Sequence, residues 1–335
     1  MKRKFINLLV LGLLVLVLAA CGGAEETNNS GESGGAREFL TIATGGTGGT
    51  YYPLGGAIAN IINTNIDNVR SNVESTGGSV ANIRLISDKE AQLAFVSADS
   101  AYYAYTGTEF FEDEESHKDL RAIASLYPEV IQVVTTEQAG VKSFDDLKGK
   151  RVAVGAAGSG TELSARIVLN AHDITYDDIQ EDFLSFGEVT TGLQDGHIAA
   201  GFVWAGIPTS SIVDLASLNK VDILPIEASR MTNILNEFPF YDEIVIPANT
   251  YNGQEEDIET IAANALLITS IEMDEDLVYE ITKYLFEKTD AIAAAHVRGE
   301  DISLETALDG VAVPLHPGTI RYYEEIGIEV PDNLK

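Results

Sequence analysis

Apolar positions along the chain change their spacing repeatedly, from short unbroken runs to helical stripes, and each change predicts an element. The run at residues 39–43 ends at a group of glycines, and apolar residues follow at helical spacing over 57–62. The same order of strand, turn and helix begins again at 69–74 and at 91–96. Three such units in succession predict a parallel sheet with helices on its faces.

A second series of elements begins near Tyr127 and predicts a second α/β lobe. Helices are predicted at 144–149, where a glycine ends a short turn, and at 163–171. Strands are predicted at the apolar runs over 130–134, 151–154, 183–186, 198–203 and 221–224.

The last third of the chain predicts a return to the first lobe. An apolar stripe over 277–285 and a short amphipathic segment over 319–326 predict helices. The apolar runs at 244–247 and 261–269 are candidates for strands that cross between the lobes.

The predicted fold class is therefore α/β, with two lobes and a ligand cleft and hinge between them. Lobe 1 is assigned to residues 38–127 plus 247–335, and lobe 2 to 128–246. A chain that leaves one lobe, builds a second and returns forms a hinge where it crosses. Clefts between lobes are common ligand sites.

The N-terminal segment is predicted to lie outside this fold. Three basic residues precede an apolar run over 8–18, the order of a secretory signal, and the run is shorter than the span of about 20 residues that a membrane helix needs. The sequence Leu-Ala-Ala-Cys ending at Cys21 resembles the lipobox of bacterial lipoproteins. Residues 1–20 are thus predicted to be removed, Cys21 to carry lipid, and 21–37 to form a flexible tether. The alternative is an ordinary signal followed by a spare thiol.

The net charge of the chain disfavours some classes of binding partner. It has 21 basic and 52 acidic residues, a net charge of −31, and loss of the signal removes three bases to leave −34. Nucleic acid and anionic lipid surfaces are therefore poor partners. An anionic solute would be repelled at long range, so a site for it needs local positive potential. Cys21 is the only cysteine, so the fold is predicted to contain no disulfide.

Glycine-rich segments supply a candidate source of that potential. The first N–H groups of a helix lack partners within the helix and attract anions. Residues 47–50, 77–79 and 159–161 each follow a predicted strand and precede a predicted helix, so together they predict a carboxylate site of backbone N–H and hydroxyl donors. For any one segment, the alternative is that glycine, serine and threonine only cap the helix.

Enzyme motifs are incomplete. The glycines at 155 and 160 have P-loop spacing, but Thr161 stands where the lysine belongs. After the first strand, Tyr51 occupies the position of the third glycine of a dinucleotide-binding loop. The five histidines lack metal-ligand spacing, and no G-x-S-x-G elbow stands between a predicted strand and a predicted helix. We therefore expect no catalysis, no metal and no cofactor.

Five segments in order carry a family resemblance: GTGGTYYPLG at 46–55, TGGSVAN at 76–82, DLKGKRV at 146–152, GSGT at 158–161 and PLHPG at 314–318. Together they resemble the TAXI family of solute receptors, which serve tripartite ATP-independent periplasmic (TRAP) transporters. The resemblance implies a type II periplasmic-binding-protein fold, closure on the ligand and docking onto ion-driven membrane subunits. It also implies a ligand such as glutamate, glutamine or a related small carboxylate.

Positions matched to the family imply ligand contacts from both lobes. Asp99 would suit an ammonium group, and its alternative role is a helix N-cap. Tyr127 and Trp204 follow strand ends, where an aromatic ring offers an apolar wall with one polar contact or simply packs in the core. The implied ligand-binding residues are Thr47, Tyr51, Ser79, Asn82, Ser97, Asp99, Tyr127, Ser159, Gly160, Thr161 and Trp204.

The sequence thus predicts a receptor of a TRAP transporter that is lipid-anchored through Cys21 on the extracytoplasmic face of a bacterial cell membrane. Its predicted partners are a small carboxylate or amino acid and the membrane subunits of the transporter. Two alternatives stay open: a substrate-binding lipoprotein of an ATP-driven (ABC) transporter, and a secreted enzyme acting on a small acid.

Overall fold

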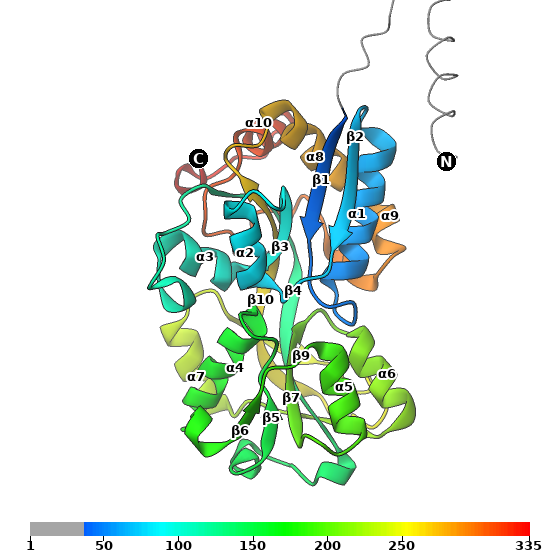
Figure 1. The fold of residues 1–335 in the computed structure, drawn as a ribbon, viewed down its shortest axis with the longest axis vertical. Helices are drawn as coiled ribbons and strands as arrows, with labels where there is room; N and C mark the ends of the chain where they lie inside the picture. The colour runs from blue at the N-terminus through cyan, green and yellow to red at the C-terminus, as the bar shows by residue number, and fades with distance from the viewer. Residues whose placement is uncertain (1–36) are drawn as a thin grey trace, which may run out of the picture. The chain divides into compact units, whose positions relative to one another are not determined.

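The computed structural model describes residues 37–335, which belong to one compact unit. The predicted signal, Cys21 and all but the last residue of the predicted tether lie outside the described residues. One ten-stranded sheet runs through two lobes of the described chain, and helices cover both of its faces (Figure 1). Within 37–335 no helix is long and apolar enough to cross a membrane.

The first lobe opens with three strand–helix units, which confirms the prediction from the spacing of apolar residues. Strand β1 pairs in parallel with β2 and with β3, so Ile42 lies opposite both Val73 and Leu93. The units are β1 Glu38–Ala43, α1 Tyr51–Asn65, β2 Val69–Glu74, α2 Ser79–Ser87, β3 Leu93–Ser97 and α3 Ala98–Thr106.

Two long antiparallel strands connect the lobes. Strand β4 spans Leu120–Thr136 and β10 spans Ile258–Ser270, and each contributes to the sheet of both lobes (Figure 1). In lobe 1, β10 pairs with β3, and in lobe 2, β4 pairs with β7, Ala200–Ala205. The β10–β4 register shifts twice between Ala265 and Ile268. Such bulges bend and twist a strand, so this stretch can act as a hinge.

The second lobe completes the sheet with shorter strands. Strand β7 pairs in parallel with β5, which in turn pairs with β6, while β8 pairs with β4 and β9 with β10. The remaining elements of lobe 2 are β5 Arg151–Ala153, α4 Gly160–Ala171, β6 Gln180–Asp182, α5 Phe186–Gln194, α6 Ser210–Leu218, β8 Val221–Leu224, α7 Ala228–Glu237 and β9 Asp242–Ile246.

The chain then returns to lobe 1, as the apolar stripe over 277–285 predicts. The final helices are α8 Glu275–Glu287, α9 Thr289–Ala293 and α10 Pro317–Glu325. Short 3-10 helices lie at Glu109–Phe111, Glu137–Ala139, Phe144–Leu147, Tyr176–Asp178, Val297–Asp301 and Asp332–Leu334.

The predicted strand at 183–186 is wrong. The strand lies just before it, at the polar β6, and Phe186 instead begins α5. A capping interaction starts this helix, because the backbone N–H and the hydroxyl of Ser185 both donate to Oε2 of Glu188, over 2.8 and 2.7 Å. Strand β6 lies at the edge of the sheet and has no buried residue. It therefore lacks the apolar run by which a strand is predicted, whereas the neighbouring apolar run belongs to the turn and the start of α5.

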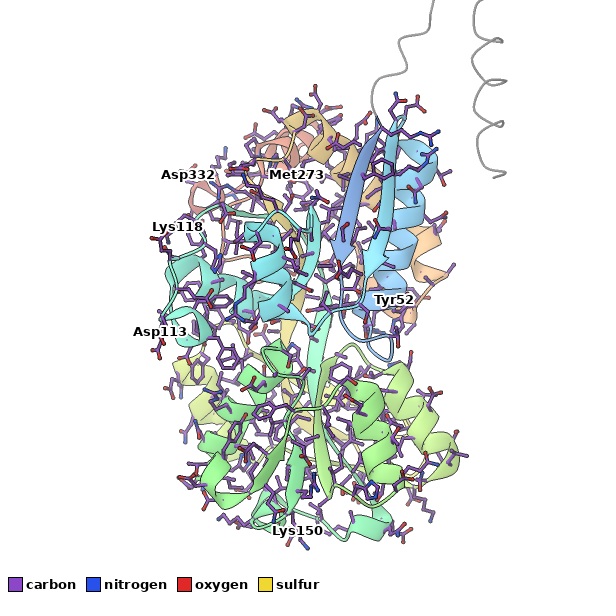
Figure 2. The ribbon with its side chains drawn as sticks, in the orientation of Figure 1. Tyr52, Asp113, Lys118, Lys150, Met273 and Asp332 are labelled. Carbon is purple, nitrogen blue, oxygen red and sulfur yellow. The ribbon has the colours of Figure 1, made fainter. Side chains whose placement is uncertain are left out.

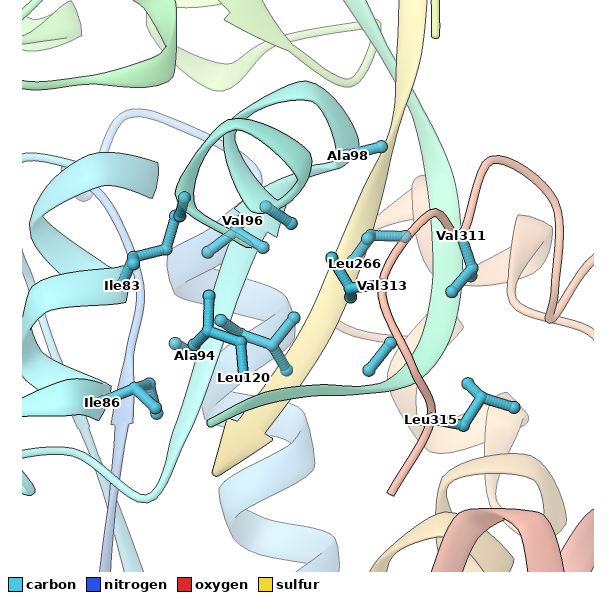
Figure 3. Packing of buried hydrophobic residues seen from close by; sticks show 14 of the residues in the cluster. Ile83, Ile86, Ala94, Val96, Ala98, Leu120, Leu266, Val311, Val313 and Leu315 are labelled. Atoms are coloured by element: carbon cyan, nitrogen blue, oxygen red, sulfur yellow. The ribbon is translucent and has the colours of Figure 1, made fainter. Parts of the chain in front are cut away.

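Each lobe packs an apolar core on both faces of the sheet, and side chains fill the space between the ribbons (Figure 2). Strand β3 shows the arrangement, because its alternate side chains enter opposite layers. Val96 packs with Ile83 and Leu266 under α2 and α3 (Figure 3), whereas Phe95 packs with Ile58 under α1. The parallel part of this mixed sheet is therefore buried on both sides, as parallel strands usually are.

Two adjacent glycines of α1 give a matched test of this packing. A Cβ on Gly55 would lie 2.6 Å from Cγ2 of Thr44, whereas a Cβ on Gly56 would meet nothing within 4 Å. We expect Gly55→Ala to lower the free energy of unfolding by about 1–3 kcal/mol through overpacking. Gly56→Ala should raise it by about 0.5–1 kcal/mol, because alanine is the better helix former. Urea unfolding of both variants checks this, and equal effects would contradict the described packing of α1.

Candidate functional site

A cavity of about 60 Å³ lies at the junction of the two lobes. Its walls are the turns that precede α1, α2, α4 and α5, together with Glu129 of β4 and Trp204 of β7. Tyr52, which is labelled in Figure 2, lies in the first turn of α1 and shows where this helix begins. The predicted meeting of glycine-rich turns from both lobes is therefore present, with a fourth turn, before α5, that the sequence analysis did not identify.

Four helices begin at this cavity. Their N-cap residues, Thr50, Gly78, Ser159 and Ser185, all line it, and the helices are 15, 9, 12 and 9 residues long. The first N–H groups of each helix have no partner inside the helix, and the aligned peptide dipoles place partial positive charge there. Two helices from each lobe thus direct positive potential into one small space.

Close contact between the lobes depends on Gly160, the first residue of α4. A Cβ at this position would lie 2.9 Å from the hydroxyl oxygens of both Ser79 and Ser97 in lobe 1. Only a residue without a side chain lets α4 begin so near them. Ser159, immediately before it, accepts a hydrogen bond from the N–H of Glu162 over 3.1 Å and so caps the helix. This segment therefore caps the helix and also lines the cavity.

The only charged side chain that lines the cavity, among the described residues, is Glu129. It is 2% exposed, and both the hydroxyl of Tyr51 and the indole N–H of Trp204 donate to its Oε2, over 2.7 and 3.2 Å. Burial raises the pKa of this carboxyl to about 8, and nearby Asp99 adds to the rise, while the two donors oppose it. At neutral pH the carboxyl of the empty protein is therefore mostly protonated.

The structure brings six of the predicted ligand-binding residues together at the cavity and places the other five elsewhere. Those that line it are Tyr51, Ser79, Ser159, Gly160, Thr161 and Trp204. Those that do not are Thr47, Asn82, Ser97, Asp99 and Tyr127.

The residues outside the lining have structural contacts instead. Thr47 is exposed in the loop before α1, and Tyr127 is buried in the lobe 1 core. The side-chain amide of Asn82 donates to the backbone carbonyls of Thr44 and Phe95, over 2.6 and 2.7 Å, and so ties α2 to the sheet. The hydroxyl of Ser97 donates a hydrogen bond to the hydroxyl oxygen of Ser100 over 2.9 Å.

Asp99, the predicted partner of an ammonium group, is fully buried and links the lobes. Its Oδ2 accepts a hydrogen bond from the hydroxyl of Tyr241 in lobe 2, over 2.8 Å, and its Oδ1 accepts one from the N–H of Ser100, over 2.6 Å. Burial raises the pKa of its carboxyl above the ordinary value. Its contacts are thus with the protein, and the acid that faces the cavity is Glu129.

Sequence analysis missed Glu129 and Phe186. A signal for Glu129 was present, because it is an acidic residue within a long run of apolar strand residues. Acidic side chains are rarely buried unless they are paired. Phe186 was assigned to a strand, so its place at a helix start was hidden. Within residues 37–335, no group of three or more histidine, cysteine, aspartate or glutamate side chains is arranged to hold a metal ion.

Fold and cavity together define the class: a mixed α/β protein with the fold of periplasmic-binding-protein-like structures. PhnD1 of Prochlorococcus marinus, solved with methylphosphonate, is 11% identical over 78% of this chain and 90% of that chain, with a TM-score of 0.52. A protein of Bordetella bronchiseptica RB50 is 16% identical over 88% and 91%, with a TM-score of 0.50. A putative L-cystine ABC transporter protein of Listeria monocytogenes is 11% identical over 80% and 99%, with a TM-score of 0.49.

The chain belongs to the NMT1-like family, whose model matches residues 42–327. The match runs from the end of β1 to just beyond α10, so it includes both lobes and every turn that lines the cavity. The broader expectation of a periplasmic-binding-protein fold is confirmed.

The raised pKa of Glu129 predicts a pH dependence of stability. The carboxyl keeps its proton in the folded state up to about pH 8 but loses it near pH 4.5 in the unfolded chain, so its contribution falls as pH rises between these values. Relative to Glu129→Gln, the wild type should lose roughly 2–4 kcal/mol of unfolding free energy between pH 5 and pH 8.

Urea unfolding of both proteins at the two pH values measures this difference, in which the part of the Asp99 contribution that is independent of Glu129 cancels. A difference that does not change with pH would show that Glu129 is ionised in the folded protein throughout this range.

Proposed function

We propose that this protein is an extracytoplasmic receptor that binds a small organic anion, most simply a carboxylate, between its lobes and delivers it to a membrane transporter. The observation that carries the proposal is the convergence of four helix N-termini, two from each lobe, on one small cavity. Such an arrangement binds an anion through backbone N–H groups without a cationic side chain. A solute that contacts both lobes also favours their closed arrangement.

The size of the cavity supports a small solute. A volume of about 60 Å³ corresponds to roughly four to six water molecules, taking about 10–15 Å³ of such volume for each. Tyr51, Phe186 and Trp204 give the cavity aromatic walls, while hydroxyl groups such as that of Ser79 supply polar contacts. Glutamate, glutamine and C4 dicarboxylates are of a suitable size class.

Two transporter types are compatible with such a receptor. The motif resemblance supports a TRAP transporter, but the family match and the two structures with TM-scores of 0.50 and 0.52 name no TRAP receptor. The alternative, a receptor of an ABC transporter, therefore fits the comparisons better. The proposed location is the outer face of the cell membrane, held by lipid on Cys21 after removal of residues 1–20.

Isothermal titration calorimetry against a panel of small acids tests the proposed function. The panel contains glutamate, glutamine, 2-oxoglutarate, succinate and methylphosphonate, the last because the similar PhnD1 structure holds it. We expect at least one member to bind without being converted, which NMR of the recovered solute checks. Turnover would favour the enzyme alternative. Failure of every acid to bind would contradict the assignment of an anion site.

Replacing Ser159 with proline tests where the solute binds. Proline removes the N–H that donates to the carbonyl of Ala156 over 3.0 Å and the hydroxyl that caps α4, so the turn before this helix should change shape. We expect the affinity for the best acid of the panel to fall about tenfold or more, the effect of losing one or two hydrogen bonds to a charged group. An unchanged affinity in a folded variant would remove this turn from the site.

A further inference from the structure

The hydrogen bonds of Glu129 leave one of its oxygens for a solute. Tyr51 and Trp204 both donate to Oε2, whereas Oε1 has no hydrogen-bond partner among residues 37–335. The side chain lines the cavity, so Oε1 is the oxygen available there. Two fixed donors from α1 and β7 hold the carboxyl in one orientation. Glu129 is thus positioned to contact a bound molecule at a defined point.

An ionised Glu129 would have no positive partner at the cavity among residues 37–335. Among the described residues, no lysine or arginine lines the cavity. The titratable groups that act on Glu129 are Tyr51 from α1 and Asp99 from α3, and Tyr127 of its own strand responds to its charge. The two tyrosines have pKa values well above 10 and stay neutral, and Asp99 disfavours a second negative charge nearby. A buried carboxylate is stable only when a positive group pairs with it.

We propose that Glu129 is the specificity-determining residue of this site, and that its Oε1 pairs with an ammonium group on the solute. This inference rests on the proposed function, because it places the carboxylate of the same solute at the helix N-termini. Amino acids, which the motif resemblance already implies, carry two opposite charges that match the two parts of the site, and the role of Glu129 is to select them over acids without an ammonium group. An organic acid of the same carbon frame without the ammonium group leaves Glu129 unpaired and is bound more weakly.

Proton release follows from this pairing. In the empty protein, burial keeps Glu129 mostly protonated at pH 7, with a pKa of about 8. An ammonium group within contact distance favours the ionised carboxylate, because opposite charges stabilise each other. The proton on Glu129 therefore passes to the solvent as the amino acid enters, and the solute keeps its own ammonium protons. Binding of an acid without an ammonium group releases no proton from Glu129.

Calorimetry with paired solutes tests the inference. The pairs are L-glutamate with 2-oxoglutarate and L-aspartate with oxaloacetate, each titrated at pH 7 in bis-Tris and in Tris, amine buffers that differ in their ionisation enthalpy. We expect the better-bound amino acid to exceed its oxo acid in affinity and to release about one proton. In Glu129→Gln the affinity for that amino acid should fall about 100-fold or more, the usual effect of removing one partner of a buried charge pair. The affinity for the oxo acid should not fall.

Two controls separate this role from a structural one. Glu259→Gln makes the same chemical change at an exposed position of β10 and should leave affinity and proton release as in the wild type. Glu129→Asp keeps the charge and should retain the preference for the amino acid, although the shorter side chain lowers affinity.

The outcomes are distinct. An oxo acid that binds the wild type as tightly as its amino acid, without proton release, would overturn the role of Glu129 and leave the anion receptor standing. Equal losses for both members of a pair in Glu129→Gln would also overturn it. Failure of all four acids to bind the wild type would contradict this inference, and with the rest of the panel it would contradict the proposed function as well.

Discussion

The structure depends on bringing the positive ends of four helices to one point. Peptide dipoles that face each other in this way repel, and only packing elsewhere holds them in place. The apolar layers on both faces of the sheet in each lobe supply that packing. Gly160 then lets α4 approach the serines of lobe 1 without a clash. The potential in the cavity is therefore a property of the fold and needs no basic side chain.

The protonation of Glu129 limits the electrostatic repulsion between the protein and an acidic solute. The chain carries a net charge of −31, so a site for acids must overcome repulsion from the protein as a whole. A carboxyl that keeps its proton in the empty cavity adds no negative charge until a cationic group arrives. Tyr51 and Trp204 orient it from different lobes, so the same contacts that hold the acid also tie the lobes together.

Much of the fold could be predicted from the sequence, because the strand–turn–helix order at 39–62, 69–87 and 91–105 comes from apolar spacing alone. The helix starting at Phe186 could not, since its signal is a capping pair of serine and glutamate beside an apolar run that imitates a strand. Site residues in the glycine-rich turns were predictable from the chemistry of helix starts. Asp99, just beyond the end of β3, and Glu129, within β4, were not distinguishable as site residues, because only the packing decides which acid faces the cavity.

The two strands that join the lobes pair with each other from Ala262 and Val130 to Ser270 and Leu120, with register shifts between Ala265 and Ile268. A ribbon of two hydrogen-bonded strands flexes easily out of its plane but resists shear within it. We therefore expect a relative motion of the lobes to be a swing about this ribbon and not a slide along it. Such a swing would bring the helix starts of one lobe back to the same positions against the other, so the recognition geometry needs no rigid frame around it.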